Sequence, residues 1–78
     1  MPTVFRWRGA RFFFYSNEGM EGPHVHIQRA GATAKFWLDP VSLASSRGFA
    51  AFDLQRLRRI VAENRARLLR AWYEHFPP

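Results

Sequence analysis

The sequence predicts a single α+β domain over residues 1–78, in which two antiparallel β-hairpins form a four-stranded sheet and a long C-terminal helix covers one face. Three observations predict this fold. Two glycine-containing turns, RGAR and AGAT, each separate stretches rich in aromatic and β-branched residues. From about Ala51, apolar residues recur at the three- and four-residue spacing of an amphipathic helix. A chain of 78 residues is long enough for one hydrophobic core and too short for two.

The two turns predict hairpins with two-residue loops. Gly9 and Gly31 each stand at the first central position, where a type II′ turn needs a positive φ that glycine adopts at little cost. We therefore expect the loops to be Gly9-Ala10 and Gly31-Ala32. The strands expected around them span residues 3–8, 11–16, 24–30 and 33–39.

The segments outside the hairpins are a loop, a connector and a helix. Residues 17–23, NEGMEGP, form the polar loop between the hairpins. After Asp39-Pro40, VSLASSRGF predicts a short edge strand or an irregular connector. The helix is expected over residues 51–75, where FPP ends it. Asn64 lies within its apolar stripe, and a buried amide needs partners, so we expect a structural hydrogen bond to loop backbone near Gly48-Phe49.

The expected pairing sorts the strand residues onto two faces. It places His24 opposite Asp39 and His26 opposite Trp37. The face expected under the helix is formed by Phe5, Trp7, Phe12, Phe14, Val25, Ile27, Phe36 and Leu38. The second face is expected to carry Arg6, Arg8, Arg11, Phe13, Tyr15, His24, His26, Gln28, Lys35, Trp37 and Asp39. Three aromatic residues make this second face too apolar to be simply solvated, so we expect a second copy of the chain, another protein or nucleic acid to cover it.

Charge and composition favour some partners over others. Twelve Lys and Arg residues against six Asp and Glu give a net charge of +6, which favours nucleic acid, an acidic protein or a ribosomal surface. The absence of cysteine excludes disulfides and cysteine-ligated zinc. The N-terminal residues contain no apolar signal segment, and no run is long enough to span a membrane, so a soluble cytoplasmic protein is expected.

The pair His24 and His26 allows several interpretations. As metal ligands they need further donors, which Asp39, Glu18, Glu21 or a histidine of a second copy of the chain can supply. As acid and base they can act on RNA without metal, with His26 as general base and His24 as an acid oriented by Asp39. The sequence HVHIQ also matches the HxHxQ pattern of histidine-triad hydrolases, although the rest of that fold is missing. Hydrogen-bonded histidines of an interface are the remaining interpretation.

The second face also supplies the binding residues of the RNA interpretation. Arg6, Arg8, Arg11 and Lys35 are the expected phosphate contacts. Phe13, Tyr15 and Trp37 are the expected aromatic contacts to bases or to a protein partner.

Five segments in order carry a resemblance to a known family. They are RFFFYSNEG, PHVHI, AKFWLDP, RGF and IVAENRARLLRAWYEHF, and they span nearly the whole chain. The chain resembles the small bacterial domain-of-unknown-function family 4160. The resemblance implies no established activity. It implies gene adjacency to domain-of-unknown-function family 2442 and hence a toxin–antitoxin-like module. Gly22, where the family often has a second proline, and the strongly basic helix depart from the family pattern.

Together these observations predict a component of a bacterial toxin–antitoxin-like or regulatory two-gene module. It is expected to bind RNA, and to cleave it without a cofactor, through the face that carries PHVH. One alternative is a non-enzymatic interaction protein, an antitoxin or adaptor that forms a homodimer through this face. Another is a divalent-metal-binding protein that uses His24 and His26.

Overall fold

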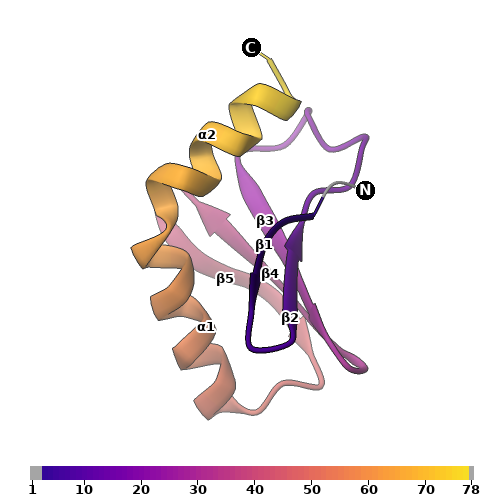
Figure 1. Cartoon of the computed structure of the whole chain (residues 1–78), viewed down its shortest axis with the longest axis vertical. Coiled ribbons are helices and arrows are strands. Elements are labelled where there is room, and N and C mark those ends of the chain that lie inside the picture. The colour runs from indigo at the N-terminus through magenta and orange to yellow at the C-terminus, as the bar shows by residue number, and fades with distance from the viewer. Residues whose placement is uncertain (1–2, 78) are drawn as a thin grey trace.

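The computed structural model describes residues 3–77 and confirms an α+β fold. Within these residues one antiparallel sheet has five strands in the order β1-β2-β3-β4-β5, and two helices pack against it (Figure 1). The elements are β1 Thr3–Trp7, β2 Ala10–Phe13, β3 His24–Arg29, β4 Ala32–Leu38, β5 Val41–Arg47, α1 Ala51–Glu63 and α2 Arg65–His75. The prediction of four strands and one helix was therefore incomplete on both counts.

Both hairpins form, but each loop lies one residue earlier than predicted. The first loop is Arg8-Gly9, with φ of 48° and 78°, so that both central residues have the positive φ of a type I′ turn. The second loop is Ala30-Gly31, with φ of 53° at Ala30. The predicted pairing was consequently wrong by two residues: Phe5 lies opposite Phe12, and Val25 lies opposite Phe36. Because side chains alternate with period two, a shift of two leaves the paired strand residues on their predicted faces, whereas Arg8 and Asp39 lie in turns outside the strands.

The segment after the Asp39-Pro40 turn is a full edge strand. β5 pairs with β4 from Val41 to Arg47, and its residues 43–47 are exposed and rich in serine. Short polar side chains on an exposed edge discourage pairing with other chains. The strand ends at Gly48, whose φ is +87° and where a Cβ would lie 3.2 Å from Cα of Ala32. Glycine is therefore required both by the backbone conformation and by the close approach.

The predicted single helix is interrupted at Asn64. Its φ of −107° and ψ of 16° leave the helical region, and Leu68 N–H restarts the ladder by donating to the Asn64 carbonyl at 2.9 Å. The Asn64 side-chain amide donates to the carbonyl of Ile60 at 2.8 Å, so the expected bond to loop backbone near Gly48-Phe49 was wrong. The break lets α2 turn away from the axis of α1 and follow the twisted sheet (Figure 1).

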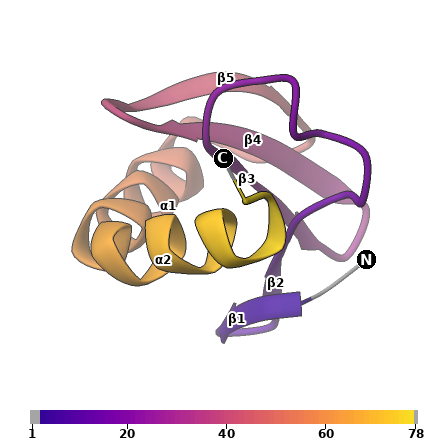
Figure 2. The same ribbon diagram turned by 90° about the horizontal axis from the view of Figure 1, so that it is seen from above.

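The core lies between the sheet and the two helices, which both cover the same face (Figure 2). Its fully buried side chains come mostly from the predicted positions of β2, β3 and β4, together with Leu57, Val61, Leu68 and Trp72 of the helices. Phe5 and Trp7 are only half-buried because β1 is the other edge strand. Neither helix in the described part of the chain is both long and apolar enough to cross a lipid bilayer.

Candidate metal centre

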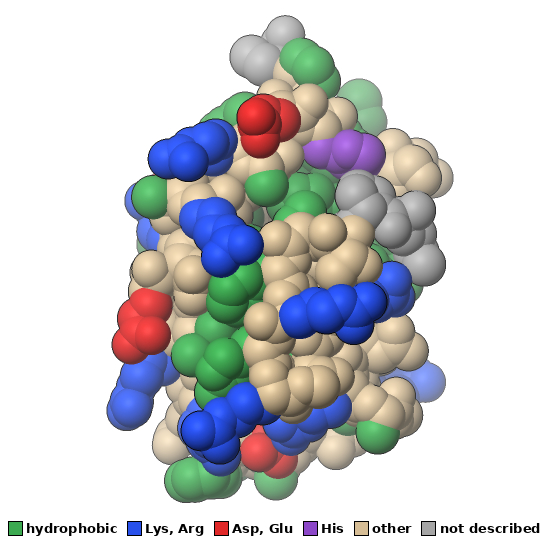
Figure 3. All heavy atoms as spheres, in the orientation of Figure 1, with side chains coloured by type: hydrophobic (Ala, Val, Ile, Leu, Met, Phe, Trp, Pro, Cys, Tyr) green, Lys and Arg blue, Asp and Glu red, His purple; other side chains and the backbone are tan. Residues whose placement is uncertain are grey.

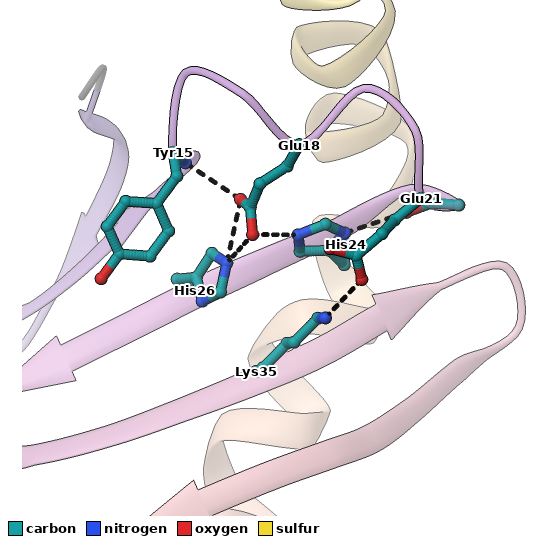
Figure 4. Close-up of polar contacts among 7 residues, drawn as sticks. Tyr15, Glu18, Glu21, His24, His26 and Lys35 are labelled. Carbon is teal, nitrogen blue, oxygen red and sulfur yellow. Dashed lines mark hydrogen bonds and ion pairs between the residues drawn. The ribbon is translucent and has the colours of Figure 1, made fainter.

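The two histidines lie at the start of β3, and the loop between β2 and β3 folds back over them. His24 begins the strand and His26 follows two residues later. The loop is shaped by a turn in which Glu21 N–H donates to the Glu18 carbonyl at 3.1 Å. It is tied to β4 by Leu38 N–H, which donates to the Pro23 carbonyl at 3.0 Å. This path brings the Glu18 carboxylate between the two imidazole rings (Figure 4).

Three ligand-type atoms converge there. Oε2 of Glu18 lies 3.0 Å from Nε2 of His24 and 2.8 Å from Nε2 of His26. One such atom from each of the three residues lies within 4.8 Å of the others. Ligand atoms bound to the same zinc ion, each about 2.0–2.2 Å from it, are separated by about 3.3–3.6 Å at the tetrahedral angle, so the three residues would move apart by about half an ångström to hold an ion. The spacing of Glu18, His24 and His26 is thus close to that of a metal's ligands.

The ring of His24 is fully buried, with an exposed fraction of 0%, and the two ring nitrogens have different partners. Nδ1 lies 2.9 Å from the carbonyl of Gly22, which can only accept, so Nδ1 carries a proton and donates it. In a neutral ring Nε2 then holds a lone pair. That lone pair faces the Glu18 carboxylate at 3.0 Å and makes no hydrogen bond with any described residue. Two acceptors so close together need a proton or a cation between them.

Aromatic rings fix both histidines in place. The His24 ring centroid lies 4.8 Å from that of Trp72 on α2 and 5.5 Å from that of Trp37 on β4. His26 stacks on Phe13 at 5.6 Å and meets Tyr15 edge-on at 4.6 Å. The rings therefore have little freedom to reorient, which is the condition for a preformed ligand site.

Glu18 is held in its ionised form. Burial raises its pKa, but hydrogen bonds from His26, from His24 when its Nε2 is protonated, and from the backbone N–H of Tyr15 together lower the pKa by more, so the net shift is downward. Tyr15 N–H donates to Oε1 at 3.1 Å, which also fixes the orientation of the carboxylate. An ionised carboxylate with one oxygen held by the backbone is suited to binding a cation through the other.

Asp39 takes no part in this cluster, and its predicted role in orienting His24 was wrong. The two-residue register shift puts Trp37, not Asp39, opposite His24. Asp39 is 65% exposed and accepts a hydrogen bond from Arg65 at 2.9 Å. Glu18 occupies the place expected for Asp39. The sequence indicated Glu18 only as one of four alternative donors, because the loop that carries it has no periodic pattern.

The other predicted contact residues lie on or beside the open face of the sheet. Lys35 is opposite His26, donates to Glu21 at 2.7 Å and lies 4.5 Å above the ring of Trp37. The Glu21 carboxyl has a lowered pKa because of this hydrogen bond. Trp37 is half-buried, and 42% of Tyr15 is exposed.

The three predicted arginines lie toward β1. Arg6 and Arg11 are directly opposite each other. The guanidinium of Arg11 lies 4.2 Å from the ring of Phe13 and donates to Gln28 at 3.1 Å. Arg8 is in the β1–β2 turn, at the opposite end of the hairpin from the Glu18 loop. Arg11 is therefore near His26, because both contact the ring of Phe13, whereas Arg8 lies away from the histidines.

Comparison with known proteins identifies the family. The family model described as Domain of unknown function (DUF4160) matches residues 9–73, and the chain belongs to that family. No curated protein and no solved structure matches the chain.

Proposed function

We propose that this DUF4160 protein binds one divalent transition-metal ion through the Glu18 carboxylate and Nε2 of His24 and His26. The observation that carries the proposal is the buried Nε2 of His24, which faces a carboxylate without a hydrogen bond. A cation between the two groups removes the repulsion and satisfies both.

The surroundings of the three residues support this proposal. Metal-binding histidines usually donate their other ring N–H to a carbonyl or carboxylate, which is what His24 does with Gly22. Two imidazoles and one carboxylate suit Zn²⁺, Fe²⁺, Co²⁺ or Ni²⁺ and leave coordination positions open for water or a substrate. An ion bound there would supply Lewis acidity at the end of the open sheet face.

An imidazolium at His24 is the competing explanation. A proton on Nε2 would also resolve the contact with Glu18, and the pair would then be a buried ion pair. Burial of two charges costs several kcal/mol unless their geometry is good, and here the ring and the carboxylate are not aligned for a hydrogen bond. The metal and proton explanations make different predictions for binding.

The test is zinc titration of the untagged, chelator-treated protein by calorimetry. We expect one ion per chain, and loss of that binding in Glu18→Gln and in His26→Asn. The double variant Glu74→Gln/His75→Asn is the matched control, because both residues are exposed on α2. Binding well below one equivalent, or equal binding by the Glu18→Gln variant, would contradict the proposal.

RNA binding over the sheet and helices is a second candidate function. Among residues 3–77, side-chain carboxylates pair with only three of the twelve basic residues, namely Arg29, Lys35 and Arg65. Figure 3 shows many Lys and Arg side chains, and few acidic ones, over the helices and the β1–β2 hairpin. Affinity for oligouridine that falls steeply with salt would support RNA binding. A flat salt response would favour a protein partner or a second copy of the chain.

The finer predictions about RNA cleavage and cellular role remain predictions. Cleavage with His24 as the general acid is disfavoured by its burial, since an acid must reach the leaving oxygen. A toxin role predicts growth arrest when the chain is expressed alone, and arrest that persists in His24→Ala/His26→Ala would separate that role from the metal centre.

A further inference from the structure

A groove of about 350 Å³ lies on the open face of the sheet and shares His26 with the candidate metal centre. It runs from Tyr15 and His26 across β4 to the edge strand β5. Figure 4 shows Tyr15, His26 and Lys35 on this side of the sheet. Its volume is in the range of small-molecule sites, which begins at about 300 Å³.

The groove is lined with hydrogen-bond donors and positive charge. Thr33 and Ser45 provide hydroxyl groups, and Lys35 and Arg47 provide cations, whereas Ser46 is paired with the core residue Ala34 and its side chain is on the covered face. The sheet register explains why the hydroxyls and cations gather there, since Lys35 is paired with Ser45 and Thr33 with Arg47. Among the described residues, no carboxylate lines the groove. Such a set selects an anion.

Of the two cations that line the groove, Arg47 is the one whose charge is not paired with a side-chain carboxylate of residues 3–77. Lys35 is already held by Glu21 at the rim, whereas Arg47 has no side-chain carboxylate within 4.0 Å among residues 3–77. A guanidinium matches two oxygens of a phosphate or a carboxylate. Two hydroxyls and a second cation beside it add further donors, which suit the three terminal oxygens of a phosphate monoester better than the two oxygens of a carboxylate.

His26 connects the groove to the metal centre. Its Nε2 donates a hydrogen bond to Glu18 at 2.8 Å in the absence of metal, and its Nδ1, across the ring, makes no hydrogen bond with any of residues 3–77. With Nε2 on a metal ion, Nδ1 carries the proton and is a donor on the ring that lines the groove.

We infer that the groove binds a phosphate monoester, with its phosphate on Arg47 and the serine and threonine hydroxyls and within reach of the metal centre at His26. This inference rests on the proposed metal site for the contact with His26. The anion contacts of Arg47 and the hydroxyls do not depend on the metal, so the two proposals can fail separately.

The experiment is a binding titration of the zinc-loaded full chain, followed by amide NMR shifts and calorimetry. The probes are ribose 5-phosphate, ribose, and succinate, a dianion that carries carboxylates instead of phosphate. We expect ribose 5-phosphate to bind and to shift amides of β4 and β5, whereas ribose and succinate bind at least ten-fold more weakly. Equal binding of succinate would overturn the phosphate assignment.

Matched arginine variants locate the site. Arg47→Ala should weaken ribose 5-phosphate binding by about ten-fold, the effect of one charge-assisted hydrogen-bonded contact, and keep one zinc per chain. Arg59→Ala, at an exposed position of α1, should change neither. Equal affinity in Arg47→Ala and wild type would overturn the inference.

The zinc measurement separates the two proposals. One zinc per chain without ribose 5-phosphate binding would overturn the groove inference and leave the metal centre standing. Arg47-dependent ester binding by a chain that takes up no zinc would overturn the metal centre and the His26 link. Arg47-dependent binding of oligouridine in the absence of ester binding would replace the small molecule with RNA.

Discussion

The two faces of the sheet use the same strands for different purposes. On the covered face, Val25 and Ile27 of β3 are fully buried and pack in the hydrophobic core. On the open face, the alternate residues His24 and His26 of that strand converge with Glu18, and the groove lies beside them. The covered face is satisfied by α1 and α2 within the chain. The open face has polar groups that lack partners within the described chain, which is why the proposed metal centre and the groove lie there.

His24 contacts residues of both the covered side and the open face. It is the one polar residue buried among residues 3–77, and its ring contacts Trp72 of the helix side as well as His26 of the open face. A ligand site built partly into the core is more rigid than one on loops alone. The core therefore supports the site directly, through the contact between the rings of Trp72 and His24.

The largest effect is expected from the covered face. Phe36→Ala should lower the free energy of unfolding by about 3–5 kcal/mol, because it removes a fully buried ring and leaves a cavity. Leu43→Ala is the control, since that side chain is 43% exposed on the edge strand and should cost much less. Urea denaturation measures both. Similar costs for the two variants would contradict the difference between the core and the exposed edge.

The next largest effect is expected from metal on the open face. Zinc at a hundred-fold excess over its Kd should stabilise the wild type by about 2.7 kcal/mol, because only the folded chain assembles the three ligands. The same zinc should leave the unfolding curve of Glu18→Gln unchanged. Thermal unfolding with zinc and with chelator measures this difference, and equal stabilisation of the variant would place the metal elsewhere.

A smaller effect is expected at the junction of the helices. Asn64→Ala should cost about 0.5–1.5 kcal/mol, because it removes the side-chain hydrogen bond to the Ile60 carbonyl. The comparison variant Ala66→Ser changes an exposed position two residues away and should be nearly neutral. A gain in stability for Asn64→Ala would mean that the junction is a strained break rather than a stabilised one.

The smallest effect is expected at the rim of the groove. The lowered pKa of Glu21 in the folded chain means that its ionised form, paired with Lys35, favours folding above the ordinary value of 4.5. This contribution is lost as the pH falls from there through the lowered pKa. In Lys35→Met the pKa of Glu21, followed by carboxyl NMR, should return toward 4.5. An unchanged pKa would assign the shift to another group.

Much of the fold was predictable because alternation and turns are local signals. Both loops were displaced by one residue, but a two-residue shift in pairing preserves the faces of the sheet. The predicted core face is therefore correct for Phe12, Val25, Ile27 and Phe36. The sequence does not distinguish a strand from a connector at β5, because a serine-rich exposed edge has no core-facing alternation along most of its length.

The site was less predictable than the fold. The pair His24 and His26 was recognised from spacing alone, but its partner depended on register and on an irregular loop. The two-residue error that left the faces intact moved Asp39 away from His24. The position of Glu18 depends on turn hydrogen bonds and on loop closure, which no sequence period reveals. The interruption at Asn64 likewise depends on how a helix follows a twisted sheet.

The most direct test of the account is a long-range ¹H–¹⁵N NMR spectrum of the histidine rings, with and without one equivalent of zinc. We predict that zinc shifts Nε2 of His24 and His26, leaves the His24 proton on Nδ1, and moves the His26 proton from Nε2, where it is donated to Glu18 in the absence of metal, to Nδ1, while exposed His75 is unchanged. A His24 ring that is protonated on both nitrogens and does not respond to zinc would contradict the account. It would show that a proton, rather than a metal ion, separates His24 from Glu18.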